Sequence, residues 1–98
     1  MTTLIASAGG LGANRTTYIV AVAYDDGCNP IPNASLTMSV VVWYQGGTYK
    51  QYTSTVQTDA GGVYFSGWDW NNIPNAYLAF ITFSYQGVQS NELTISPP

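Results

Sequence analysis

The fold class is decided by residues 36–43, which read Leu36-Thr37-Met38-Ser39-Val40-Val41-Val42-Trp43. Every second residue from Leu36 onward is apolar, while the positions between begin with polar Thr37 and Ser39. This period of two is typical of a β-strand that turns one face toward a core. Val41 and Trp43 lie on the opposite face, and both faces of one strand cannot lie inside the same two-layer core. We therefore expect Trp43 to be exposed or to be covered by another part of the molecule.

The same period of two runs through other segments. Residues 18–23 are apolar at odd and even positions alike, which predicts a central strand. Residues 77–85 are apolar at each odd position, and residues 48–58 are rich in Thr, Tyr and Val, which suits a half-exposed strand. A short last strand at residues 93–95 precedes the two C-terminal prolines, which stop further pairing.

These patterns also predict which side chains face the core. On the central strands we expect inward-facing Tyr18, Phe83 and Tyr85. In residues 63–66 we expect Val63 and Phe65 to point inward, and Tyr64 and Ser66 to point outward.

Turn-forming Gly, Asn, Asp and Pro separate the strands at intervals of roughly 8–12 residues, the spacing of an all-β sandwich. No window carries a helical stripe, and 98 residues suit one domain. We therefore expect an all-β, immunoglobulin-like Greek-key β-sandwich of about seven strands, formed by residues 1–98 as a single domain. A small closed barrel is the alternative.

Three short motifs resemble a known family. Residues 24–36 read Tyr24-Asp25-Asp26-Gly27-Cys28-Asn29-Pro30-Ile31-Pro32-Asn33-Ala34-Ser35-Leu36 and resemble the turn after the second strand of bacterial immunoglobulin-like domains of the invasin and intimin type. Residues 58–65, Thr58-Asp59-Ala60-Gly61-Gly62-Val63-Tyr64-Phe65, are similar to the turn before their fifth strand, and residues 81–87 to their penultimate strand. The resemblance spans roughly residues 17 to 95 and implies the immunoglobulin-like fold. Cys28 is an extra residue in the first motif, and the Trp-rich segment 66–75 is longer and more aromatic than in that family.

Composition excludes several classes of function. The chain has two basic and five acidic residues, a net charge of −3 and a pI near 4.1, so it lacks the basic patch that binds phosphates, and we expect no nucleic-acid partner. It has no histidine and one cysteine, which removes the commonest general base, an internal disulfide and a multi-cysteine zinc site. We therefore expect no enzymatic activity and no cofactor, with calcium as the one exception considered below.

The sequence also bears on location. No stretch approaches the roughly 18 apolar residues that span a bilayer, so we expect no membrane insertion. The first ten residues lack the basic start and sustained apolar run of a signal peptide. We expect a chain that is made in the cytoplasm, exported already trimmed, or cut from a larger protein. Its expected place is extracellular, at a cell surface or at a virion surface.

The acidic residues lie in or beside predicted turns. Alternate loops of a sandwich gather at one end, so Asp25, Asp26 and Asp69 could converge on Ca²⁺. The alternative is that each aspartate accepts hydrogen bonds from its own turn backbone.

Four other positions have a functional and a structural interpretation. Lys50 could form an isopeptide bond, or it could protect the edge of a sheet from unwanted pairing. Cys28 could pair between subunits in an oxidising compartment, but no neighbouring cation in the sequence would activate its thiol, so we expect a spectator. Asn14 and Asn33 begin N-glycosylation triplets, which matter only in a secreted protein of a glycosylating organism.

The aromatic residues carry the main functional signal. Trp43, Trp68 and Trp70 are predicted to form exposed contacts with protein or with sugar rings. The alternative is that Trp68 or Trp70 closes the end of the sandwich.

Two functions follow from these observations. The first is a structural subunit of a pilus, sheath, surface layer or capsid decoration, which binds copies of itself or another surface or virion protein. Residues 1–10, with Leu4 and Ile5, could then donate a strand to a neighbour.

The second is a carbohydrate-binding or adhesive module. Its stacking platform would add tyrosines to the tryptophans, with amide side chains as polar partners: Tyr44, Tyr49 and Tyr64, with Gln45, Gln51, Asn71 and Asn72.

Overall fold

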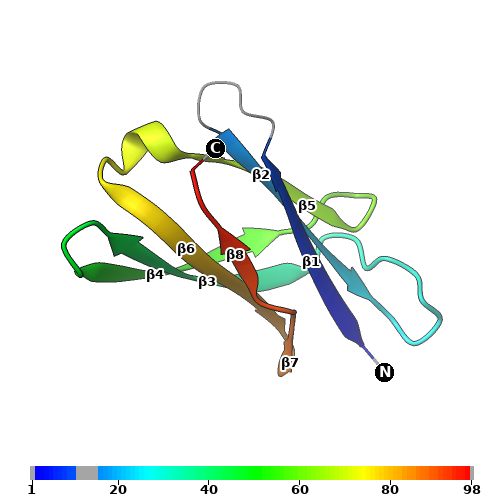
Figure 1. Ribbon diagram of the computed structural model, residues 1–98. Helices are drawn as coiled ribbons and strands as arrows, with labels where there is room; N and C mark the ends of the chain where they lie inside the picture. The colour runs from blue at the N-terminus through cyan, green and yellow to red at the C-terminus, as the bar shows by residue number, and fades with distance from the viewer. Residues whose placement is uncertain (1, 11–15, 98) are drawn as a thin grey trace.

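The computed structural model describes residues 2–10 and 16–97 as two antiparallel β-sheets packed face to face (Figure 1). The smaller sheet has the order β1-β2-β5, from strands β1 (Thr3–Gly10), β2 (Thr16–Tyr24) and β5 (Val63–Asp69). The larger sheet has the order β4-β3-β6-β7, from β4 (Tyr49–Gln57), β3 (Ser35–Tyr44), β6 (Ala76–Tyr85) and β7 (Val88–Gln89), and β8 (Leu93–Ile95) also pairs with β6. A 3-10 turn (Trp70–Asn72) follows β5, and the described residues include no helix long and apolar enough to cross a membrane.

This arrangement confirms the all-β, immunoglobulin-like Greek-key sandwich. The chain crosses from one sheet to the other between β2 and β3, between β4 and β5, and between β5 and β6, while the two sheets stay separate. It is therefore a sandwich and not the closed barrel. The described residues form eight strands where about seven were expected, because a tight turn with positive φ at Gln86 and Gly87 pairs β7 with the end of β6, and β8 then pairs farther along the same strand.

The core lies between the sheets, and β3 and β6 supply much of it. Leu36, Val40 and Val42 are buried, which confirms the predicted inner face of β3. On β6, Ile81 and Phe83 are fully buried. Tyr85 is half-buried and packs against the core, as predicted.

The prediction for Tyr18 is wrong. On β2 the odd-numbered residues from Thr17 to Ala23 are buried, and Tyr18 lies on the outer face. β2 is the middle strand of its sheet, but only one of its two apolar faces is covered by the other sheet. When a strand is apolar on both faces, its sequence does not show which face packs against the core.

The orientation predicted for β5 is also wrong. Phe65 is 61% exposed, whereas Tyr64 packs against the core and meets the Phe83 ring edge-on at 5.8 Å between centroids. Pairing with β2 sets this orientation, because Tyr64 lies opposite buried Ala21. The small Ala21 side chain leaves room for the large tyrosine ring inside the sandwich.

Candidate functional site

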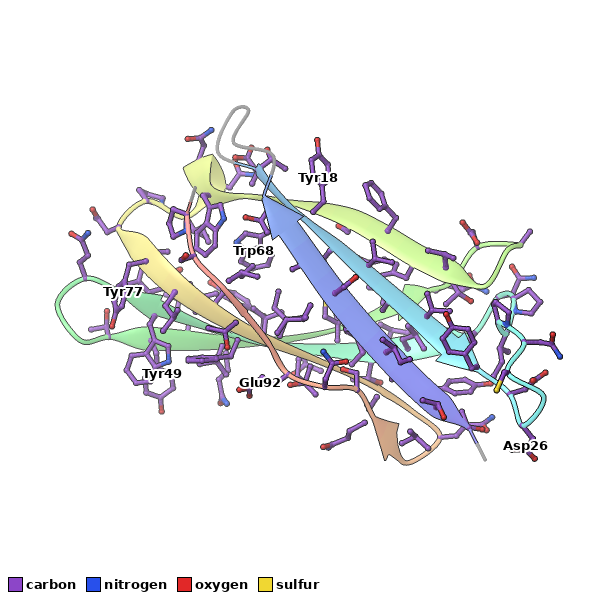
Figure 2. The ribbon with its side chains drawn as sticks, turned by 45° about the vertical axis from the view of Figure 1, so that its right-hand side comes forward. Tyr18, Asp26, Tyr49, Trp68, Tyr77 and Glu92 are labelled. Atoms are coloured by element: carbon purple, nitrogen blue, oxygen red, sulfur yellow. The ribbon has the colours of Figure 1, made fainter. Side chains whose placement is uncertain are left out.

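Much of the outer side of the smaller sheet is apolar. Pairing aligns nine of its outward residues in three rows across β1, β2 and β5: Ile5–Val22–Val63, Ser7–Val20–Phe65 and Gly9–Tyr18–Gly67. We call these nine residues the apolar face. None of them is charged; Ile5 on β1 is 51% exposed, and Phe65 on β5 is 61% exposed. Thr3–Tyr24 and Thr16–Asp69 are further outward pairs of this sheet, and Asp69 is charged and exposed. Figure 2 shows Tyr18 projecting from the outer side of this sheet.

An aromatic pair and a shallow hollow flank Val20, the middle residue of the apolar face. The Tyr18 and Phe65 rings stack with centroids 5.4 Å apart and planes inclined by 18°. A hollow of about 530 Å³ opens beside them, between the two rings and the Ser7–Gly9 backbone. Gly9 leaves this space open, since a Cβ there would meet nothing within 4 Å. Contiguous exposed apolar surface of this kind marks a site of interaction.

The outer side of the larger sheet divides into two halves. Two rows across β4, β3 and β6 carry only hydroxyls: Thr55–Thr37–Ser84 and Thr53–Ser39–Thr82. The next two rows are mainly apolar or aromatic: Gln51–Val41–Phe80 and Tyr49–Trp43–Leu78. Trp43 lies on this outer face, as the alternation predicts, and is half-buried beside Tyr49 at 4.9 Å between ring centroids.

Trp68 and Trp70 do not form an exposed platform. Trp70 is 1% exposed and donates a hydrogen bond from Nε1 to Thr17 Oγ1 at 2.8 Å. Trp68 is half-buried against the core and meets the Trp70 ring edge-on at 6.1 Å. The Asp69 carboxylate accepts a hydrogen bond from the Asn71 N–H and begins the 3-10 turn whose first residue, Trp70, is buried. The alternative interpretation, closure of one end of the sandwich, is therefore correct (Figure 2).

The predicted interface residues fall into two groups. Ile5 and Trp43 lie on outer faces, where a partner could reach them. Leu4, Tyr64, Trp68 and Trp70 pack in or against the core. Tyr18, Val20 and Phe65 were not among the predicted interface residues, although segment 18–23, which is apolar on both faces, was a signal that one such face would remain uncovered.

The N-terminal segment is part of the monomer's own sheet. β1 pairs with β2 along its whole length and buries Leu4 and Ala6. The Asn91 side chain holds the free side of β1, because its Oδ1 accepts from Ala6 N–H and its Nδ2 donates to Ala6 O, both at 2.9 Å. Donation of residues 1–10 to a neighbour stays a prediction, and it would require β1 to leave these partners.

The predicted convergence of carboxylates on calcium is wrong. Asp25 and Asp26 follow the end of β2, whereas Asp69 lies opposite Thr16 at its start. The two ends of β2 are about 26 Å apart at the usual rise per residue, and Figure 2 shows Asp26 far from Trp68, the neighbour of Asp69. Within residues 2–10 and 16–97 no three acidic, histidine or cysteine side chains could hold a metal together.

The aspartates instead hold their own turns. Asp25 Oδ1 accepts hydrogen bonds from the backbone N–H of Gly27 and Asn29, both at 2.9 Å. Asp59 Oδ1 accepts in the same way from Gly61 at 2.8 Å and Val63 at 3.0 Å. These bonds match the structural interpretation of the acidic residues.

Lys50 and its neighbours form a small polar and aromatic group on β4. Lys50 is exposed on an edge strand, and its Nζ lies 5.8 Å from the centroid of the Tyr44 ring. An isopeptide bond needs a buried lysine beside a carboxylic acid. Lys50 is exposed, so it does not meet this requirement. A hydrogen bond with Tyr52 raises the pKa of Tyr44, and burial raises it further.

The remaining candidate positions lie in turns. Cys28 is an exposed free thiol at φ 63°, and Asn33 is exposed at φ 56°. Asn14 lies outside the described residues.

Comparison with known proteins yields a structural likeness. No family model matches the chain, and no curated protein matches it. The solution structure of CsgH from R. palustris is similar with a TM-score of 0.43 and 12% sequence identity, over 99% of this chain and 93% of that chain.

Proposed function

We propose that this chain is a non-enzymatic structural subunit that associates with copies of itself in an extracellular or virion-surface assembly. Such assemblies include a pilus, a sheath, a surface layer and a capsid decoration, and another surface or virion protein could be an additional partner. The observation that carries this proposal is the apolar face, an uncharged sheet surface with Ile5 and Phe65 more than half exposed.

The energetics of this surface favour association. Burying a large apolar side chain contributes about 1.5–3 kcal/mol, and Ile5, Val20 and Phe65 lie in adjacent rows of one sheet. Aromatic residues near the centre of a patch are the usual source of binding energy in protein interfaces, and the stacked Tyr18–Phe65 pair flanks Val20, the middle residue of the apolar face. The three rows carry no charge, and Asp69 is the one charged outward residue on the described strands of this sheet, so little like-charge repulsion opposes the approach of two copies.

We also propose that residues 1–98 are one domain related to the bacterial immunoglobulin-like domains of the invasin and intimin type. The support is local chemistry at two of the shared motifs. Asp25 and Asp59 each accept two backbone hydrogen bonds within the motif that contains them. A surface location fits such a module.

Sedimentation tests self-association. Phe65→Thr removes the most exposed ring of the apolar face and keeps a residue suited to a strand. We expect the wild-type chain to form particles heavier than 10.5 kDa and Phe65→Thr to form smaller ones at the same concentration. Tyr77→Thr is the matched control, since it removes a 44% exposed ring away from the apolar face and should leave the particle mass unchanged. Equal masses for all three chains would contradict the role of the apolar face.

A different observation supports a second function, a carbohydrate-binding or adhesive module. Trp43 and Tyr49 lie side by side on the outer face of the larger sheet, next to Gln51 and the hydroxyl rows, an arrangement that suits a sugar ring and its hydroxyls. A carbohydrate-binding or adhesive module would change Trp fluorescence when titrated with soluble polysaccharides, and Trp43→Ala would abolish that change. A monomeric wild-type chain that binds a polysaccharide would favour this function over self-association.

A further inference from the structure

In the described part of the chain, three of the four sheet edges are shortened or occupied. On β1, the Asn91 amide bonds both backbone groups of Ala6. On β5, the Val63 N–H donates to the Asp59 carboxylate and the Val63 C=O accepts from the Asp59 N–H, which leaves only part of a seven-residue strand open. The edge formed by β7 and β8 consists of strands of two and three residues. Such features protect a sheet from pairing with another chain.

The fourth edge is long and open. β4 has nine residues, all exposed except half-buried Val56, and among the residues that the structure describes it pairs only with β3. Figure 1 shows it at the border of the larger sheet. An edge of this length offers a full row of backbone donors and acceptors to a strand from another molecule.

The hydrogen bonds at the two ends of β4 identify which backbone groups point outward. Tyr44 N–H donates to Thr48 O at 2.8 Å, and Thr58 N–H donates to Ala34 O at 2.9 Å. Because bonding alternates along an antiparallel pair, the even-numbered residues of β4 bond to β3. The N–H and C=O groups of the odd-numbered residues, Tyr49 to Gln57, therefore point away from the sheet.

The side chains of β4 permit pairing. Residues 51–57 read Gln51-Tyr52-Thr53-Ser54-Thr55-Val56-Gln57, with no charge, glycine or proline. Such segments with many β-formers pair readily when they are exposed. The single charge on the strand, Lys50, lies near its start and against the Tyr44 ring of its own chain.

We infer that the β4 edge pairs in antiparallel orientation with the β4 edge of a second copy, around a two-fold axis at Thr53. This inference rests on the proposed self-association and assigns it a second contact. The outward backbone groups of the two strands then match. Thr53 lies opposite Thr53 of the second copy, Gln51 opposite Thr55 of the second copy, and Tyr49 opposite Gln57 of the second copy. The five strands of each larger sheet join into one continuous sheet of ten.

The charge arrangement favours a second copy as the occupant. In this register Lys50 faces Val56 of the other copy, so the two lysines are not opposed. Thr53 opposite Thr53 is a favourable cross-strand pair, because threonines pair well across antiparallel strands. Lys50 is the one charge on this edge, so pairing does not require a partner strand of opposite charge.

The edge contact and the apolar face lie on different sheets, so one subunit can use both. The edge contact is two-fold, and a contact between the apolar faces of two copies would be two-fold as well, because the same patch is used on both sides. Each contact alone would then close a dimer with twice the chain mass of 10.5 kDa. Used alternately, they join subunits into larger particles. Removing either contact should therefore stop assembly at the dimer, and removing both should give the monomer.

Thr53→Pro tests the edge directly. Proline removes the Thr53 N–H, which points away from β3, and proline is tolerated at such edge positions. Thr53→Val is the matched control, because it keeps the N–H and the branched side chain. We expect Thr53→Val to match the wild-type particle mass and Thr53→Pro to fall to the mass of a dimer, with far-UV circular dichroism unchanged. A Thr53→Pro mass equal to that of the wild type would overturn the edge contact while leaving self-association intact.

A charge pair tests the two-fold axis without proline. Thr53→Lys and Thr53→Glu each place like charges opposite each other across the axis, so each alone should lose the edge contact. An equal mixture should recover the wild-type mass, since opposite charges then meet. Full assembly of either variant alone, or no recovery in the mixture, would contradict the axis at Thr53. A wild-type chain that stays at 10.5 kDa would remove both the proposed function and this contact.

Discussion

At the scale of single residues, the loops are held by short polar contacts and one close approach. Thr58 is buried, donates from Oγ1 to Ile31 O at 2.9 Å and accepts from Ala34 N–H at 2.8 Å, which ties two loops together. Gly62 lies in the same region at φ 83°, and a Cβ there would collide with the Pro30 ring. This glycine therefore serves both the backbone conformation and the contact between loops.

Gly62→Ala should destabilise the fold more than Gly87→Ala. Both glycines have positive φ, 83° and 80°, so both substitutions bear the left-handed backbone cost of about 1–2 kcal/mol. Only Gly62 adds a steric clash, which typically costs about 1–3 kcal/mol more. Urea denaturation monitored by fluorescence measures the difference. Equal unfolding midpoints for the two variants would show that the Pro30 contact has no energetic weight.

At the scale of strands, the sequence predicted orientation only where one face was clearly polar. Thr37 and Ser39 identified the outer face of β3, and the inner face followed correctly. β2 and β5 carry apolar side chains on both faces, so their orientation depended on strand pairing and on space beside Ala21. The inward turn of Trp70 likewise depended on the Asp69 cap, which spacing alone does not reveal.

For the candidate surfaces, the sequence predicted the positions of some single residues but not the surface that several strands form together. The outward position of Trp43 followed from alternation on β3, and the edge position of Lys50 from its place after Gly46 and Gly47. The apolar face was not predicted, since its rows combine the consecutive strands β1 and β2 with β5, which is far from them in the sequence. The pairing register decides which residues of neighbouring strands lie side by side, and the sequence of a single segment does not specify that register.

Asn91→Ala should loosen β1. The substitution removes two hydrogen bonds to Ala6, and each such bond contributes about 0.5–1.5 kcal/mol. We expect faster hydrogen exchange at the Ala6 amide, measured by NMR, and a lower melting temperature. Asn72→Ala, at an exposed position of the 3-10 turn, is the control and should change neither. Unchanged exchange at Ala6 would mean that pairing with β2 alone holds this strand.

At the scale of the whole molecule, the two sheets differ in what they leave uncovered. The smaller sheet leaves an apolar face, and the larger sheet leaves an open nine-residue edge. The chain is 98 residues long and carries only seven charged side chains, two basic and five acidic. Little charge therefore opposes contact between copies, which is consistent with a subunit whose surface is completed by neighbours.

Combining the two substitutions tests whether the contacts are separate. Phe65→Thr and Thr53→Pro lie on different sheets and should each leave a dimer, with twice the chain mass of 10.5 kDa. The double variant should be a monomer of 10.5 kDa. A monomer from Thr53→Pro alone would mean that the apolar face does not join two copies, and a monomer from Phe65→Thr alone would mean the same for the edge.

The most direct test of the central claim is the mass of the wild-type chain, measured by sedimentation across a wide range of concentration. Self-association through both contacts predicts particles heavier than a dimer of the 10.5 kDa chain, and their mass should increase with concentration. A single species of 10.5 kDa at every concentration would contradict it.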